Sequence, residues 1–176
     1  MSELQIRRAT EEDAALIAAI SRETFYDSFA AQNTAEDMTL FMERQFDTEL
    51  LIQEVADEAH IFFLTFYGDT PAGYAKLKPG THPELTDTAA ALEICRFYAR
   101  KPFIGKGIGK AMMQHAIQYA EANAYHTIWL GVWEHNQRAI DFYRLFGFQK
   151  FSEHDFVLGN DVQRDWLMRK EVGCEW

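Results

Sequence analysis

The feature that most constrains the fold is a glycine-rich run, Gly-Lys-Gly-Ile-Gly, at residues 105–109. It follows a strand-like apolar segment, residues 90–98, and precedes a segment with helical apolar spacing that ends near Asn123. Glycines let backbone N–H groups converge on an anion without interference from side chains. The start of a helix adds partial positive charge, and Lys106 and Lys110 add more. The run therefore predicts a phosphate or pyrophosphate site at a strand–helix junction.

The spacing around this run excludes two common nucleotide motifs. A nucleotide P-loop needs Ser or Thr after its Gly-Lys pair and another glycine further upstream, but Ala111 and Ile104 occupy those places. A dinucleotide fingerprint needs its third glycine at the position of Lys110. A turn that simply requires flexible residues remains the alternative to a phosphate site.

Hydrophobic periodicity predicts three amphipathic helices before the first buried strand. Thr10, Thr34 and Asp47 are the expected N-caps, because each precedes a run with apolar residues at helical spacing. The residues expected to face the core are Ile17, Ile20, Thr24, Phe25, Met38, Phe41, Met42, Gln45, Leu51 and Val55.

The rest of the chain predicts a sheet with further helices. The expected strands cover residues 5–9, 61–67, 71–77, 90–98 and 126–132, with a final hairpin of 148–157 and 162–169. A helix is expected over 136–146, with Gly147 ending it in a left-handed conformation and Phe148 folding back on its last turn. We expect one α/β domain over residues 1–170, followed by a tail, 171–176.

Composition and charge narrow the class of protein. The 176 residues suit one domain with a single core, and 48% apolar with 25% charged residues is typical of soluble globular proteins. The net charge of −10 argues against nucleic-acid binding, which needs a basic surface. The same charge attracts a cationic substrate such as an amine, or serves solubility alone.

Nothing in the sequence predicts a membrane span or an export signal. Charged residues interrupt every long apolar stretch, and residues 1–8 lack an apolar signal-peptide core. Cys95 and Cys174 are too far apart to suggest a disulfide framework. We therefore expect a cytoplasmic protein without a membrane partner.

A second motif, His-Asn-Gln-Arg-Ala-Ile-Asp-Phe-Tyr-Arg-Leu-Phe-Gly-Phe, covers residues 135–148. With the glycine run before it, it resembles the GNAT superfamily of acetyl-CoA-dependent N-acetyltransferases. The resemblance extends over nearly the whole chain and implies a single α/β domain. The implied domain has a mixed, mostly antiparallel twisted sheet flanked by helices, with splayed central strands. Residues 23–26 and 92–98 also resemble the PaiA-type polyamine acetyltransferase branch.

The resemblance implies acetyl-CoA as co-substrate and assigns roles to particular residues. Tyr143 matches the family's general acid, directed at the CoA sulfur; a plain core tyrosine is the alternative. Asn136 binds CoA, caps its helix, or does both. Ile104 departs from the family's usual Gln or Arg, which weakens one polar contact. The predicted acetyl-CoA contacts are Phe97, Tyr98, Ala99, Ile104, Gly105, Lys106, Gly107, Ile108, Gly109, Lys110, Asn136, Ala139 and Tyr143.

The general base is predicted from strand alternation. Glu93 should share a face of its strand with Cys95 and Phe97, where its carboxylate accepts the proton of the amine directly or through water. A carboxylate paired with a nearby cation is the alternative, and His135 and His126 are other candidates for the base.

The acceptor site is expected between the early helices and the terminal hairpin. Tyr26 and Phe29 are predicted to form one wall, because an aromatic and acidic pocket suits a cationic amine; core packing is the alternative. No metal site is expected, because the histidines lack paired ligand spacing.

Three functions fit this pattern. The first is acetylation of a small-molecule primary amine or polyamine. The second is a protein N-terminal or lysine acetyltransferase, and the third is a CoA-binding regulatory module without catalysis. Tyr143 favours an enzyme. A homodimer is possible, because the sequence indicates no particular oligomeric state.

Overall fold

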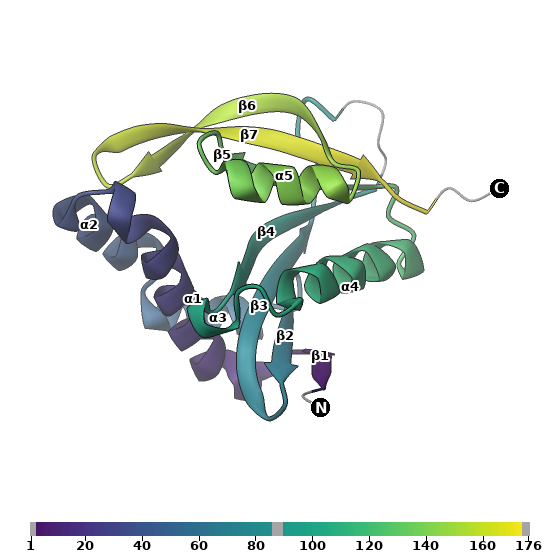
Figure 1. The fold of residues 1–176 in the computed structure, drawn as a ribbon, viewed down its shortest axis with the longest axis horizontal. Helices are drawn as coiled ribbons and strands as arrows, with labels where there is room; N and C mark the ends of the chain where they lie inside the picture. Colours follow the sequence, from purple (N-terminus) through teal and green to yellow (C-terminus); the bar gives the residue numbers. More distant parts are fainter. Residues whose placement is uncertain (1–2, 86–89, 174–176) are drawn as a thin grey trace.

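A mixed sheet forms the centre of the molecule and carries helices on both faces (Figure 1). The computed structural model describes residues 3–85 and 90–173. Within these ranges, seven strands follow the order β1-β2-β3-β4-β5-β7-β6. Only the β4–β5 pair is parallel among the strand pairs of this described sheet. The predicted mixed, mostly antiparallel α/β architecture is confirmed.

Each predicted helix and strand is present, with ends that differ from expectation by a residue or two. Short 3-10 turns cover Glu11–Asp13, Ala30–Gln32 and Lys101–Phe103. The main elements are β1 (Leu4–Arg8), α1 (Ala14–Phe29), α2 (Ala35–Gln45), α3 (Thr48–Ala56), β2 (Ile61–Tyr67), β3 (Thr70–Pro79), β4 (Ala91–Ala99), α4 (Ile108–Ala122), β5 (Thr127–Trp133), α5 (Gln137–Leu145), β6 (Gln149–Leu158) and β7 (Asp161–Glu171).

The end of the last strand bears on the expected tail. Glu171 is the final residue of β7, and Val172 is buried with the core beneath the sheet. Cys174 and the rest of 174–176 lie outside the described residues. The division between a domain of 1–170 and a tail stays a prediction.

Polar side chains begin α2 and α3 as the sequence predicts, whereas Thr10 precedes the 3-10 turn Glu11–Asp13 and Asp13 is the N-cap of α1. The Thr34 hydroxyl accepts a hydrogen bond from the Asp37 N–H at 3.1 Å, and the Asp47 carboxylate accepts one from Glu49 at 3.0 Å. At Thr10 the backbone N–H donates to the Asp13 carboxylate at 2.9 Å. These bonds satisfy N–H groups that have no partner inside a helix.

The predicted apolar stripes face the core with one exception. Gln45 is exposed, because α2 ends there and Phe46 takes the buried place beside the helix. Phe46 lies 4.6 Å, ring centre to ring centre, from Phe25 of α1. The cluster around these rings fills the space between α1, α2 and the terminal hairpin.

A bulge in β4 separates the two halves of the sheet. Lys76 of β3 faces Arg96, but the next residue, Leu77, faces Ile94, so Cys95 is an extra residue in β4. A bulge bends and twists its strand. Accordingly β4 pairs with β5 only over residues 91–94, and the two strands then diverge (Figure 1). The expected splay is confirmed.

The bulge also changes which face each residue of β4 presents. Ile94 and Phe97 both pack on the side of α4 and α5. Alternation around the extra residue therefore turns Glu93 to the opposite face, with Arg96. The expectation that Glu93 shares a face with Phe97 was wrong, because simple alternation does not anticipate a bulge.

The short helix α5 is anchored by few buried side chains, which makes its stability testable. Ile140 is 0% exposed, whereas Leu145 on the same helix is 86% exposed. We expect Ile140→Ala to lower the free energy of unfolding by about 2–5 kcal/mol through lost burial and a cavity. Leu145→Ala, the matched control, should change it by less than about 0.5 kcal/mol. Urea titrations of both variants would measure this; equal losses would contradict the packing described for α5.

Candidate functional site

A cavity of about 370 Å³ occupies the space where β4 and β5 diverge. Its walls come from α1 and α2 on one face of the sheet, from α5 on the other, and from the terminal hairpin. The cavity therefore joins both faces of the sheet. Such a passage lets two reactants meet from opposite sides.

Tyr143 of α5 enters this cavity from the α5 face. Its side chain is 8% exposed and packs edge-on against Phe97, 6.4 Å between ring centres. Burial raises the pKa of the Tyr143 hydroxyl, so the group stays protonated at neutral pH. A protonated hydroxyl at this position can donate a proton or a hydrogen bond.

Both ends of α5 hold Tyr143 in place. Asn136 caps the helix, its side-chain oxygen accepting the Ala139 N–H at 3.2 Å, while its side chain also lines the cavity. At the other end Gly147 has φ +92°, and the Phe148 N–H donates to the Tyr143 carbonyl at 3.1 Å. This is the hydrogen-bond pattern of a Schellman motif, and the predicted helix end is confirmed.

The glycine run lies between the end of β4 and α4, as predicted. Gly105 and Gly107 have φ values of +86° and +82°, which favour glycine, and nothing stands within 4 Å of the place a Cβ would take on either. Helix α4 begins at Ile108, so its first N–H groups have no partner within the helix. The run leaves open space in front of backbone donors, an arrangement that fits an anion.

The side chains around the run are not gathered over it. Lys106 lies over the Tyr67 ring, with Nζ 5.3 Å from its centre, and Lys110 is exposed. Ile104 is 45% exposed. Gly109 packs near Phe142, whose ring would be 3.5 Å from an added Cβ. Backbone amides, rather than lysine side chains, are therefore the groups that the run offers to an anion.

An ion-pair cluster holds the one cation of the cavity lining in the described chain. Arg96 donates to both carboxylate oxygens of Glu54, at 2.8 and 3.2 Å, and Lys76 donates to the same carboxylate at 3.1 Å. Burial acts to raise the pKa of Glu54, but these two cations outweigh it, and the pKa lies below its ordinary value. Arg96 is thereby held by a carboxylate that it shares with Lys76. This cluster, which joins α3 to two strands, was not among the sequence-based predictions.

Asp165 of β7 is a second residue that the sequence analysis missed. Its side chain is 16% exposed and lines the cavity beside Gly131, where an added Cβ would lie 3.5 Å from the carboxylate. His154 Nε2 is 3.9 Å from the same carboxylate. Burial raises the pKa of Asp165, and the charge of His154 partly offsets the rise. One sequence signal could have identified Asp165: it is a charged residue directly before the apolar run Trp166-Leu167-Met168.

The other predicted site residues are divided between the cavity and its surroundings. Phe29 and Tyr98 line the cavity, whereas Tyr26 is 55% exposed and does not line it. Glu93 also lies outside the lining, on the face opposite Phe97. His126 is exposed at the start of β5.

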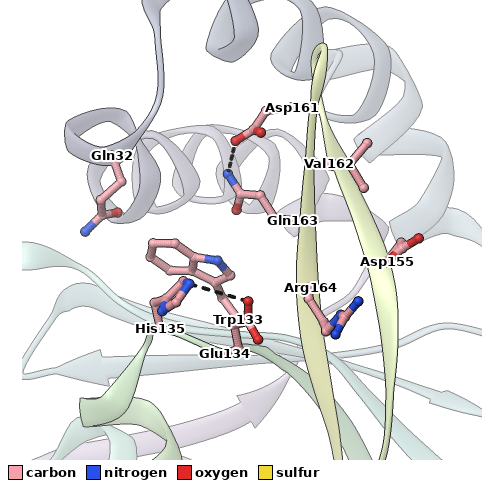
Figure 2. A pocket seen from close by; sticks show the side chains of 9 residues that line it. All are labelled: Gln32, Trp133, Glu134, His135, Asp155, Asp161, Val162, Gln163 and Arg164. Atoms are coloured by element: carbon pink, nitrogen blue, oxygen red, sulfur yellow. Dashed lines mark hydrogen bonds and ion pairs between the residues drawn. The ribbon is translucent and has the colours of Figure 1, made fainter.

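A second cavity, of about 420 Å³, adjoins the first at Trp133 (Figure 2). It is lined by residues from the end of β5 and from the β6–β7 hairpin. Carboxylates of Glu134, Asp155 and Asp161 border it, together with the cation of Arg164. The hairpin thus lines this cavity, and most of the charged side chains at the cavity are acidic. That the hairpin forms a wall of the acceptor site stays a prediction.

Residues 3–85 and 90–173 contain neither a metal-binding cluster nor a membrane-spanning helix. No cluster of three or more His, Cys, Asp or Glu side chains in these ranges is arranged to hold a metal ion. No helix among them has the length and apolar character needed to cross a bilayer.

Comparison with known proteins gives consistent matches. The model of the acetyltransferase (GNAT) family matches residues 22–148. An uncharacterized N-acetyltransferase in the pepI 3′ region of Lactobacillus delbrueckii subsp. lactis is 38% identical over 172 residues, which cover 98% of this chain and 99% of that protein.

Two further likenesses concern the polyamine branch and the fold. The spermine/spermidine N(1)-acetyltransferase of Bacillus subtilis is 42% identical over 62 residues, covering 35% of this chain and 41% of that protein. The crystal structure of PaiA N-acetyltransferase from Thermoplasma acidophilum in complex with coenzyme A has a TM-score of 0.75 at 21% identity, covering 96% of this chain and 99% of that one.

Proposed function

Since the chain belongs to the GNAT family of acetyltransferases and is an N-acetyltransferase, we propose that it transfers the acetyl group of acetyl-CoA to a small primary amine. Polyamines are the acceptor class we favour. The observation that carries this proposal is the cavity between β4 and β5, which Tyr143 enters from one face of the sheet and which shares Trp133 with an acidic cavity. The glycine run lies next to its wall, since a Cβ added to Gly109 would be 4.0 Å from the ring of Phe97.

The donor is assigned to the diverging strands and the start of α4. Gly105, Gly107 and the first amides of α4 hold the pyrophosphate, an assignment supported by open space where each glycine lacks a Cβ. The backbone of Phe97, Tyr98 and Ala99 holds the pantetheine arm, since β4 has no partner strand on that side after Ile94. When bound, acetyl-CoA supplies an activated acyl group.

Tyr143 acts as the general acid. Its hydroxyl is buried, protonated and directed into the cavity by a helix whose two ends are both capped. As the C–S bond of the thioester breaks, Tyr143 donates a proton to the leaving sulfur. Burial also favours this role, because water does not compete for the hydroxyl.

The acceptor approaches from the acidic side. The second cavity has carboxylates of Glu134, Asp155 and Asp161 beside the Trp133 ring, which suits an ammonium group or a chain of them. Phe29 forms part of the aromatic wall. The partial likeness to a spermine/spermidine acetyltransferase points to the same class of acceptor.

Release of CoA thiol from acetyl-CoA, measured against polyamines, amino acids, aminoglycosides and peptides, tests the function. We expect the highest kcat/KM with polyamines, and we expect that value to fall as salt screens the acidic surface. Preference for peptide N-termini or lysines would instead favour a protein acetyltransferase. Binding of acetyl-CoA without turnover of any amine would favour a regulatory module.

The glycine run can be tested with a matched pair of variants. Gly107 and Gly68 both have positive φ and open space around an added Cβ, at +82° and +61°. Substitution of either glycine with alanine should lower the free energy of unfolding by a similar amount, about 1 kcal/mol. Only Gly107→Ala should also weaken CoA binding, roughly tenfold or about 1.4 kcal/mol, because its methyl group enters the anion site. Calorimetric titration with CoA would measure this, and equal CoA affinities would remove Gly107 from the site.

The role of Tyr143 predicts a specific kinetic change. Tyr143→Phe removes the proton donor and should lower kcat roughly a hundredfold while leaving the Kd for CoA unchanged. Tyr125→Phe removes a hydroxyl outside the cavity and serves as the control. Steady-state rates and CoA titrations of both variants decide the matter, and an unaltered kcat in Tyr143→Phe would exclude it as the acid.

A further inference from the structure

We propose that Asp165 is the catalytic proton acceptor for the attacking amine, and that His154 conducts the proton from Asp165 to solvent. This inference rests on the proposed acetyl transfer to an amine and adds the residue that makes the amine reactive. It replaces neither the acetyl-CoA assignment nor Tyr143.

Asp165 has the chemistry that an ammonium group requires. Among the described residues that line the cavity, it supplies the only carboxylate and Arg96 the only cation. Glu54, which also binds Lys76, holds Arg96 through both carboxylate oxygens. The charged group that acts on Asp165 is His154, not Arg96. The Asp165 carboxylate remains for a cation that enters the cavity.

The position of Asp165 matches the direction from which the acceptor comes. Tyr143 enters the cavity from α5, where Leu130 and Val132 also pack. Gly131 lies between those two residues in β5, so a Cβ added to it would point to the opposite face of the sheet. That Cβ would lie next to Asp165, which is therefore on the opposite face from Tyr143. The proton donor and the proton acceptor thus reach one cavity from opposite faces of the sheet, and an acyl carbon held between them would separate the two proton transfers.

Gly131 keeps the carboxylate accessible. A Cβ on this residue would lie 3.5 Å from Asp165 Oδ2 and 3.9 Å from His154 Nε2. A larger side chain would cover both groups. With glycine there, the carboxylate is open toward the cavity on one side and adjoins His154 on the other.

His154 provides the route to water. Its side chain is 46% exposed, whereas that of Asp165 is 16% exposed, and their nearest polar atoms are 3.9 Å apart. A small side-chain rotation or one bridging water closes this separation when a proton passes. An imidazole can take up a proton at one nitrogen and release one from the other. The pair therefore extends from the buried carboxylate to the surface of the hairpin.

The proton balance of the reaction uses both groups. The ammonium gives one proton to Asp165, which passes it through His154 to solvent, and the neutral nitrogen then attacks the acyl carbon. An N–C bond forms and the C–S bond breaks. The nitrogen then loses a second proton to Asp165, and the sulfur takes one from Tyr143. Return of one proton to the Tyr143 oxygen restores the enzyme, so the products are an amide, a thiol and one released proton.

The groups that face Asp165 set the direction of its pH dependence. Tyr98, Tyr143 and Cys95 in the cavity all have pKa values raised first of all by burial, so they are neutral near pH 7. Arg96 is paired with Glu54, and His154 lies behind the carboxylate. Burial raises the pKa of Asp165, which makes it a stronger base than an ordinary aspartate. Activity should fall as the pH drops through that pKa, because the protonated carboxyl cannot accept another proton.

The pH dependence of kcat/KM in Asp165→Asn, with a polyamine and with a fluorinated ethylamine that is neutral at the assay pH, tests the proposal. With the polyamine we expect kcat to fall about a hundredfold or more and the acidic limb of the profile to disappear. With the amine that is already neutral, the fall in kcat should be far smaller. His154→Gln should move the acidic limb to higher pH, because the imidazolium charge lowers the pKa of Asp165.

The controls separate this role from structural and binding roles. Asp69→Asn makes the same change at an exposed turn and should leave the profile unaltered. A raised KM with unchanged kcat and an unmoved limb in Asp165→Asn would reduce Asp165 to an ammonium anchor and overturn the proposal. So would loss of the acidic limb in Glu93→Gln alone, which would identify Glu93 as the base.

A measurement on the wild-type protein does not depend on turnover or on folding of a variant. The carbon-13 resonance of the Asp165 carboxyl group should titrate above the range of an ordinary aspartate, and added spermidine should lower its midpoint. A carboxyl group that does not respond to spermidine would overturn the proposal for Asp165. Absence of acetyl transfer to every amine would instead contradict the proposed function, so the two failures are distinguishable.

Discussion

The bulge at Cys95 is the constraint on which the site depends. With one extra residue in β4, hydrogen bonding to β5 ends after Ile94, while β4 remains paired with β3 as far as Ala99. Two halves of one sheet thus separate without the sheet losing continuity. The energetic cost of unpaired backbone in the gap is tolerable only where another group can meet those amides and carbonyls. A gap of this kind is therefore suited to hold an extended chain with its own amides.

The helices on either side turn that gap into a site with two entrances. Met113 of α4 and Ile140 of α5 are fully buried on one face, and Ile17 of α1 is fully buried on the other. The hairpin closes the far end, its tip held to α2 by the Asp37 carboxylate, which accepts the Asn160 N–H at 2.8 Å. The cavity wall is thus built by segments distant in sequence, and each is fixed by its own core contacts.

The elements and the glycine run could be predicted from sequence because their signals are local. Caps at Thr34 and Asp47, the turn at Gly147 and the junction at residues 105–109 each depend on residues within one turn of chain. The face of Glu93 could not be predicted, since the bulge arises from pairing between β3 and β4. Asp165 was missed for a related reason: its neighbours Gly131 and His154 are brought to it by strand pairing over long sequence separations.

The charges of the cavity follow from this long-range pairing rather than from overall composition. A net charge of −10 draws cations to the whole surface, but it does not select a position for them. Position comes from the ion pair of Arg96 with Glu54 and from the place of Asp165, the one carboxylate among the described residues that line the gap, beside His154. The carboxylates of the second cavity, which includes Trp133, extend this negative charge toward the surface. An amine would therefore meet increasing enclosure on its way from a surface that collects cations to a buried carboxylate that can take a proton.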